Sequence, residues 1–194
     1  MSSKAVNRRL VHTREIKTQA FARDDGLWDL EASLIDTKAK DFPLASGVRP
    51  AGDAIHHMFL LVTIDERFNI VAAQARTESM PYPGYCNRIE PEYQKLVGLN
   101  LLNGFRSDVK RLLSGVLGCS HLTELCSVLP TVAIQAFAGE VINVRDGQKE
   151  SSHNMPFQLN RCHALRTDQE VVKKYYQTWY GAPVVPTEMP KIKK

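Results

Sequence analysis

The hydrophobic period of this chain changes after Cys86. Before that residue, four runs are rich in β-branched and apolar residues, and they span residues 10–22, 27–37, 55–64 and 68–77. After it, apolar residues recur every three or four positions. A period of two is typical of half-buried strands, whereas a period near 3.6 is typical of amphipathic helices. Strands followed by helices predict an α+β fold, in which helices pack on one face of a sheet.

Short polar turns separate the predicted strands in pairs. Arg23-Asp24-Asp25-Gly26 joins the first two runs, and Asp65-Glu66-Arg67 joins the last two. Asp-Gly between extended runs is a strong hairpin signal, because glycine tolerates the positive φ of such a turn. Residues 38–53 carry two prolines and two glycines, which predicts an irregular connection between the hairpins. The four strands are therefore expected to form an antiparallel meander sheet.

Three helices are expected in the second half of the chain. A short helix over residues 91–97 opens with proline, which is tolerated in a first turn. An amphipathic helix over residues 105–117 has apolar residues at intervals of three and four, and Gly115 and Gly118 end it. Ser120 can cap the next helix, roughly residues 120–144, which is apolar nearly all round. Such a helix is expected to be buried on several sides.

Length and composition favour one domain. A chain of 194 residues with 43% hydrophobic residues supports one core of ordinary size, so residues 1–180 are expected to form a single domain. Residues 181–194 contain three prolines and are expected to be extended or disordered. No apolar run approaches the ~20 residues of a membrane span, and the N-terminus lacks the apolar stretch of a secretory signal. We therefore expect a cytoplasmic protein with no membrane association.

Charge and motifs narrow the range of partners. The net charge of +4 comes mainly from lysines and arginines at the two ends of the chain, and charged ends are more often solvated tails than nucleic-acid grooves. The glycine-rich phosphate-binding motifs are absent, so no nucleotide is expected.

Four aromatic residues lie close together near the C-terminus: Tyr175, Tyr176, Trp179 and Tyr180. This cluster fits either a homodimer surface or a lid over the sheet. The remaining partner classes are another protein and a small molecule.

Cys119 and His121 stand at the expected start of the buried helix. The partial positive charge at a helix N-terminus favours the thiolate form of a cysteine, which is the form that binds metals. Antiparallel pairing brings His56 or His57, at the start of the third strand, close to Cys86, just after the fourth. If the helix N-terminus packs over that end of the sheet, Cys86, Cys119, His121 and His56 converge. Thiolate and imidazole ligands in this combination predict a zinc or iron site.

Two other interpretations of these residues stay open. In the first, the cysteines are core residues of a metal-free interaction module, because a buried cysteine packs as a small apolar side chain. In the second, Cys119 is the nucleophile of an enzyme and works with His121 and one of three acids, Asp29, Asp36 or Glu124. Three further residues either join the metal site or have structural roles: His57, Cys162 and His163.

Five longer motifs carry a family resemblance. They are RDDGLWDLEASLIDTK (23–38), YPGYC (82–86), LVGLNLLNGF (96–105), GCSHLTEL (118–125) and CHAL (162–165). Together they resemble a bacterial family named domain of unknown function 2889, over nearly the whole chain to about Tyr180. The resemblance implies no particular activity. The family usually has His-Asp where this chain has His56-His57.

A weaker resemblance lies in the order of the site residues. His56 near the start of a strand, Cys86 after the return strand, and Cys119 near His121 at a helix start are similar in order to the iron–sulfur cluster assembly scaffold proteins. By position, His56 replaces the first scaffold cysteine, Cys86 matches the second, and His57 stands where the scaffolds have an acid. This resemblance implies a similar fold that carries a mononuclear zinc or iron site.

Overall fold

The computed structural model describes residues 6–142 and 155–185. They belong to two compact units, Met1–Ala133 and Ile134–Lys194, and the boundary between the units falls within a long helix. The single domain expected over residues 1–180 stays a prediction. Residues 186–194, which make up most of the expected C-terminal tail, lie outside the described part of the chain.

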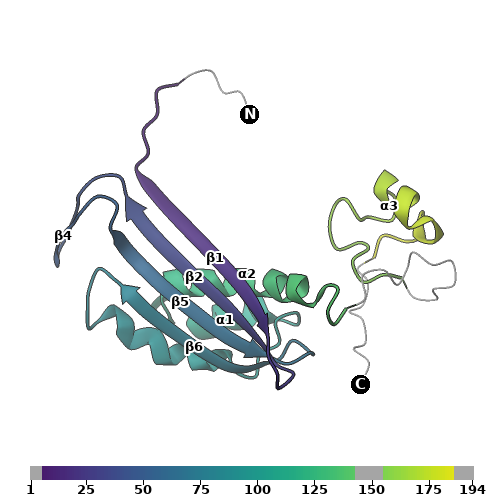
Figure 1. Ribbon diagram of the computed structural model, residues 1–194, viewed down its shortest axis with the longest axis horizontal. Helices are drawn as coiled ribbons and strands as arrows, with labels where there is room; N and C mark the ends of the chain where they lie inside the picture. The colour runs from purple at the N-terminus through teal and green to yellow at the C-terminus, as the bar shows by residue number, and fades with distance from the viewer. Residues whose placement is uncertain (1–5, 143–154, 186–194) are drawn as a thin grey trace. The chain divides into compact units, whose positions relative to one another are not determined.

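An antiparallel sheet of four long strands forms the centre of the first unit (Figure 1). In spatial order its strands are β1 (His12–Ala22), β2 (Trp28–Lys38), β5 (Ala54–Ile64) and β6 (Ile70–Ser79). Spatial neighbours follow each other along the chain, apart from one short inserted hairpin, so the predicted meander is confirmed. Gly26 has a φ of 79° in the turn between β1 and β2, as the Asp-Gly signal predicts.

The connection between β2 and β5 differs from its prediction. It contains a small hairpin of its own, β3 (Phe42–Leu44) and β4 (Gly47–Arg49), where the sequence predicted irregular structure. Strands of three residues are too short to produce a visible alternation of apolar and polar positions. The prolines and glycines of this segment therefore dominated the sequence signal.

Alternate side chains of the central strands form the core of the first unit. Leu30 and Leu34 of β2 and Leu60 and Val62 of β5 are each at most 1% exposed. Glu31, which points to the opposite face of the sheet, is exposed. Burial of each aliphatic side chain contributes about 1.5–3 kcal/mol, so the apolar face of the sheet supplies much of the free energy of folding.

Helical segments cover the apolar face of this sheet (Figure 1). They are η1 (Cys86–Leu96), α1 (Phe105–Leu113), η2 (Gly115–Leu117) and α2 (Ser120–Phe137), the last of which begins in this unit. α1 buries Phe105, Val109 and Leu113, which recur every four residues and so lie on one side of the helix. The predicted α+β class, with a meander sheet and helices on one face, is confirmed.

α2 begins where the sequence predicted and ends earlier. It runs from Ser120 to Phe137, whereas the apolar pattern suggested an end near residue 144. Gly139 has a φ of 91°, the left-handed conformation that commonly terminates helices. The chain then turns back, and the N–H of Ile142 donates to the carbonyl of Phe137 at 2.8 Å. Apolar residues therefore continue past Phe137 without extending the helix.

The second unit contains two short helical segments, α3 (Glu170–Tyr175) and η3 (Gln177–Trp179). Thr167 is fully buried within it, and its hydroxyl donates to the carbonyl of Ala182 at 2.7 Å. The N–H of Thr167 donates to Oδ1 of Asn160 at 3.0 Å. These bonds pair the polar groups of a buried residue, as a stable interior requires. Within residues 6–142 and 155–185, no helix is both long enough and apolar enough to cross a membrane.

Candidate metal centre

Three side chains form a row across β1, β2 and β5 on the helix-covered face of the sheet. Arg14 lies directly opposite Asp36 in the β1–β2 register, and Asp36 lies directly opposite His56 in the β2–β5 register. Side chains at directly paired positions point to the same face of a sheet. Asp36 also follows Leu30 and Leu34 at even spacing along β2, so alternation places its carboxylate on the buried side.

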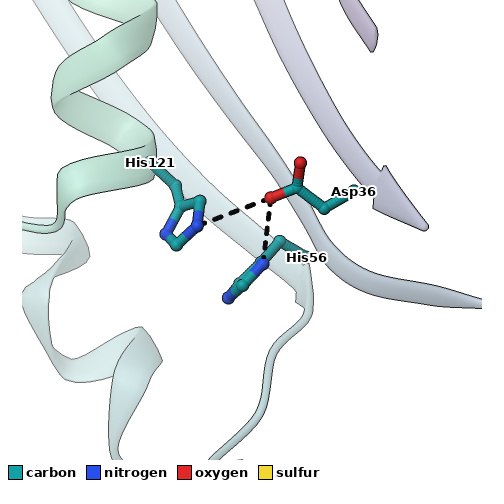
Figure 2. Close-up of side chains that lie close together, drawn as sticks. All are labelled: Asp36, His56 and His121. Carbon is teal, nitrogen blue, oxygen red and sulfur yellow. Dashed lines mark hydrogen bonds and ion pairs between the residues drawn. The ribbon is translucent and has the colours of Figure 1, made fainter. Parts of the chain in front are cut away.

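The first turn of α2 places His121 over this row. Its Nε2 lies 3.4 Å from Oδ2 of Asp36, and Nδ1 of His56 lies 3.1 Å from the same oxygen. Figure 2 shows the two imidazoles approaching one carboxylate oxygen from a helix and from a strand. Their rings are stacked, with centroids 3.7 Å apart and planes inclined at 27°. Three residues from separate elements thus meet at a single oxygen atom.

Asp36 is an ionised carboxylate in a buried position. Its side chain is only 4% exposed, and Arg14 binds it through two bonds of 2.8 Å, from Nε to Oδ1 and from Nη2 to Oδ2. His12 adds a contact of 3.0 Å from Nε2 to Oδ1. Burial alone would raise the pKa of Asp36, but the bonds from Arg14 and His12 and the charge of Arg14 outweigh it and lower the pKa to about 2. The carboxylate therefore keeps its negative charge at neutral pH.

The two stacked histidines are held neutral. Burial is the main cause that lowers the pKa of His121 to about 4, and the charge of His56 lowers it further against the opposing effect of Asp36. Burial likewise lowers the pKa of His56, although Asp36 opposes this effect. At pH 7 both rings are thus neutral, and each has one nitrogen with a free lone pair. The neutral imidazole is the form that binds metal ions.

More nitrogens surround the Asp36 carboxylate than its oxygens can accept hydrogen bonds from. Five nitrogens lie within 3.4 Å of its oxygens: Nε and Nη2 of Arg14, Nε2 of His12, Nδ1 of His56 and Nε2 of His121. Three of these nitrogens approach Oδ2, whereas an ionised carboxylate offers only about two lone-pair positions at each oxygen. At least one imidazole therefore directs an unprotonated nitrogen toward this oxygen.

Cys119 lies next to the histidine cluster, on the side of His121 that faces away from Asp36. Its Sγ is 3.9 Å from Nδ1 of His121 and 3.9 Å from Sδ of Met58. Tyr93 holds its backbone, because the Tyr93 hydroxyl accepts from the Cys119 N–H at 3.0 Å and donates to the Cys119 carbonyl at 2.9 Å. Burial raises the pKa of Tyr93 to about 12, so the hydroxyl stays protonated. The start of α2 is thus anchored to η1.

The residues predicted from the sequence are only partly brought together. Within the described residues, one group of three or more ligand-type side chains has its ligand atoms all within 4.8 Å of one another, and it consists of Asp36, His56 and His121. Cys119 is adjacent to this group through His121, whereas Cys86 begins η1 and lies outside the group. Their assignment as metal ligands stays a prediction.

The remaining candidate ligands, His57, Cys162 and His163, have different surroundings. His57 points to the opposite face of the sheet, where its Nδ1 lies 3.1 Å from Oε2 of Glu78. Cys162 and His163 belong to the second unit, and Cys162 is exposed. Of the adjacent pair His56-His57, only His56 therefore contributes to the cluster, as strand alternation requires.

Asp36 and its arginine are the members of the site that the sequence interpretation did not place there. The sequence suggests Asp36 only as one of three acids that could assist Cys119, and it assigns no site role to Arg14, one of the basic residues toward the N-terminus. The sequence of β2 did contain a signal for Asp36. Positions 30, 32 and 34 are apolar, and Asp36 continues the same spacing of two, so it falls on the buried side of the strand. An acid at a core position of a strand requires a charged or hydrogen-bonding partner.

Comparison with family models assigns the chain. A model described as protein of unknown function (DUF2889) matches residues 12–135, a span that contains the whole sheet and every residue of the cluster. The chain belongs to this family, and the first sequence resemblance is confirmed. Comparisons with curated proteins and with solved structures gave no significant match. The resemblance to iron–sulfur scaffolds therefore has no support from related proteins.

Proposed function

We propose that this DUF2889 protein binds a divalent transition metal ion, zinc or ferrous iron, through Asp36, His56 and His121. The observation that carries the proposal is the meeting of two neutral imidazoles at one carboxylate oxygen, toward which at least one ring directs a lone pair and not an N–H. A metal ion would accept lone pairs from both rings and from Oδ2, and so would remove the repulsion between an unprotonated nitrogen and the carboxylate oxygen. Two histidines and one carboxylate form a ligand set typical of non-haem iron and of catalytic zinc.

The distances between the ligand atoms fit a small coordination sphere. Metal–ligand bonds of about 2.0–2.1 Å in a tetrahedral site place neighbouring ligand atoms about 3.3 Å apart. Oδ2 of Asp36 lies 3.1 Å from Nδ1 of His56 and 3.4 Å from Nε2 of His121. Three protein ligands leave at least one coordination position open. A metal bound there would supply Lewis acidity and an activated water.

Cys119 would act as an additional ligand or as a partner to the ligand His121. With Nε2 on the metal, the proton of His121 resides on Nδ1 and can be donated toward the Cys119 sulfur 3.9 Å away. Such contacts to the second nitrogen orient metal-bound histidines. Cys86, which begins η1, would complete the set expected from the sequence.

Arg14 opposes metal binding at this position. It occupies both oxygens of Asp36, and its positive charge lies beside the proposed ion. A bound metal must therefore share Oδ2 with the guanidinium or displace Nη2 from it. The affinity is consequently expected to lie below that of a site in which the carboxylate has no cationic partner.

Metal titration of the full chain tests the proposal. We expect about one equivalent of Zn²⁺ or Co²⁺ to bind at pH 7.5, as measured by calorimetry and by elemental analysis after dialysis. The variant His121→Ala should lose this binding, while the control His57→Ala, altered on the opposite face of the same sheet, should retain it. Equal binding by both variants would contradict the proposal. In the Co²⁺ form, a sulfur-to-metal charge-transfer band that disappears in Cys119→Ala would identify the thiolate as a ligand.

A second candidate function rests on the order Cys119–His121–Asp36. The sulfur lies 3.9 Å from Nδ1 of His121, and Nε2 of the same ring lies 3.4 Å from Asp36. In this alternative the ring donates its Nε2 proton to Asp36, and Nδ1 accepts the proton of the thiol, as in a nucleophile–base–acid unit. The cytoplasmic location expected from the sequence would keep the thiol reduced.

The two candidates differ in the proton of one histidine and can be separated. Nitrogen-15 NMR of His121 should report the proton on Nδ1 in the metal-loaded protein, and on Nε2 in the nucleophile alternative. Iodoacetamide labelling with a chelator present gives a second measurement. A nucleophilic Cys119 should label faster than exposed Cys162 and slow markedly in His121→Ala, whereas buried Cys126 serves as the unreactive reference.

A further inference from the structure

A groove separates α1 from the start of α2 on the helical layer of the first unit. Its volume is about 470 Å³, which is within the range of pockets that hold small molecules. Its floor is apolar and consists of Phe105, Val109 and Leu113 of α1 together with Cys126 of α2. These four residues are at most 6% exposed, so the floor belongs to the core while the groove above it is open.

The thiol in this floor is inert. Burial raises the pKa of Cys126 to about 12, and its sulfur lies 3.7 Å from the carbonyl of Leu122 within the helix. A neutral buried thiol behaves as a small apolar group. The floor therefore favours non-covalent contact with an apolar body.

The α1 side of the groove carries two cations. Arg106 and Lys110 both line it, one helical turn apart, and among the described residues neither has an ion-pair partner. Arg111 of the same helix does not line the groove and is paired with Asp108 at 2.8 Å. Glu124 stands on the α2 side as the only acid lining the groove, which leaves an excess of positive charge.

The groove is distinct from the histidine cluster. The α2 residues that line it include Ser120, Thr123, Glu124 and Ser127, which follow the three- and four-residue spacing of one helix side. His121 does not line the groove and points toward the sheet, where it meets Asp36. Ligands at the two places would therefore not compete for the same residues.

We propose that this groove binds a small amphiphilic anion, namely a carboxylate attached to an unbranched apolar chain. The apolar chain of the ligand would lie on the Phe105–Val109–Leu113 floor, and its own carbon surface would be removed from water there. The carboxylate would lie between Arg106 and Lys110, whose charges have no other partner among the described residues. The occupant is inferred from the combination of an apolar floor and a net positive rim, and does not depend on the metal proposal.

Calorimetric titration of the full chain with decanoate, below its micellar concentration, tests the proposal. We expect saturable binding of one equivalent, weakened about three- to fivefold by Arg106→Gln and by Lys110→Gln, and not by the control Arg111→Gln. Glu124→Gln should strengthen binding about two- to threefold, because it removes the opposing charge. Decyltrimethylammonium, which has the same chain and the opposite charge, should bind more weakly than decanoate.

A second pair of variants tests the position of the ligand without altering the charge. Ser127→Trp adds a large side chain at an exposed position that lines the groove and should abolish decanoate binding. Ser107→Trp, at an exposed position of α1 outside the groove, should leave it unchanged. Equal binding of the cationic probe, equal effects of the two tryptophans, or no saturable binding would each overturn the proposal.

Discussion

Acidification should destabilise the first unit through His121 before any carboxylate of the cluster titrates. The folded protein holds the pKa of His121 at about 4, against an ordinary value of 6.5. Between these values the unfolded chain binds a proton that the folded chain rejects, so the free energy of unfolding falls as the pH falls. Asp36, with a pKa of about 2, stays ionised throughout this window.

The size of the effect follows from the two pKa values. A difference of about 2.5 between them corresponds to about 3 kcal/mol when the whole window is crossed, and to about 2 kcal/mol between pH 7 and pH 4.5. The side chain of His121 is 22% exposed, so solvent screening leaves most of this effect in place. His56 has its pKa lowered in the same direction and adds to the loss.

Urea unfolding followed by circular dichroism at pH 7.0, 6.0, 5.0 and 4.5 measures this loss, with a chelator present to remove metal effects. His121→Gln should reduce the decline in unfolding free energy by about 2 kcal/mol over that range. His57→Gln, on the opposite face of the sheet beside Glu78, should follow the wild-type curve. Parallel pH dependences for wild type and His121→Gln would refute the claim that burial holds this ring neutral.

Three further substitutions have defined outcomes. Arg14→Gln should tighten Zn²⁺ binding in calorimetry, because the negative charge of Asp36 is no longer shared with the guanidinium. The same variant should lower the unfolding free energy of the metal-free protein by about 3 kcal/mol, because it leaves the buried carboxylate without its cationic partner. Gly118→Ala places a Cβ 2.2 Å from the carbonyl oxygen of Leu113, a backbone atom that cannot move freely, so urea unfolding should show a loss of at least about 2 kcal/mol. Tyr93→Phe removes the hydroxyl that pairs backbone groups before α2, and should cost about 1–3 kcal/mol in the same assay.

Local pattern was sufficient for the elements of the sheet and for the start of α2. The alternation around Leu30 and Leu34 and the Asp-Gly turn are properties of neighbouring residues, and the observed strands match them within about two residues at each end. The sequence predicted an end of α2 that lies too late in the chain. Beyond Phe137 the chain reverses direction, and the apolar residues in this reversal have a pattern that cannot be distinguished from a longer helix.

The candidate site was predictable only in part. His56 and His121 were chosen from the sequence, and the structure brings them into contact at 3.7 Å between ring centroids. Cys86 was expected beside them because it follows the strand that returns to the same end of the sheet. In the structure Cys86 begins η1, and Asp36 of β2 lies next to the two rings. The assignment of Cys86 as a ligand stays a prediction.

The sequence by itself determined the four long strands, the start of α2 and the family, because these depend on periodicity and on motifs that are contiguous along the chain. Only the tertiary structure decided that Arg14, Asp36 and His56 form one row, since that depends on the register between β1, β2 and β5. It also decided the neutral state of His121. That state results from burial by segments distant in sequence, and burial is a property of packing that no local pattern contains.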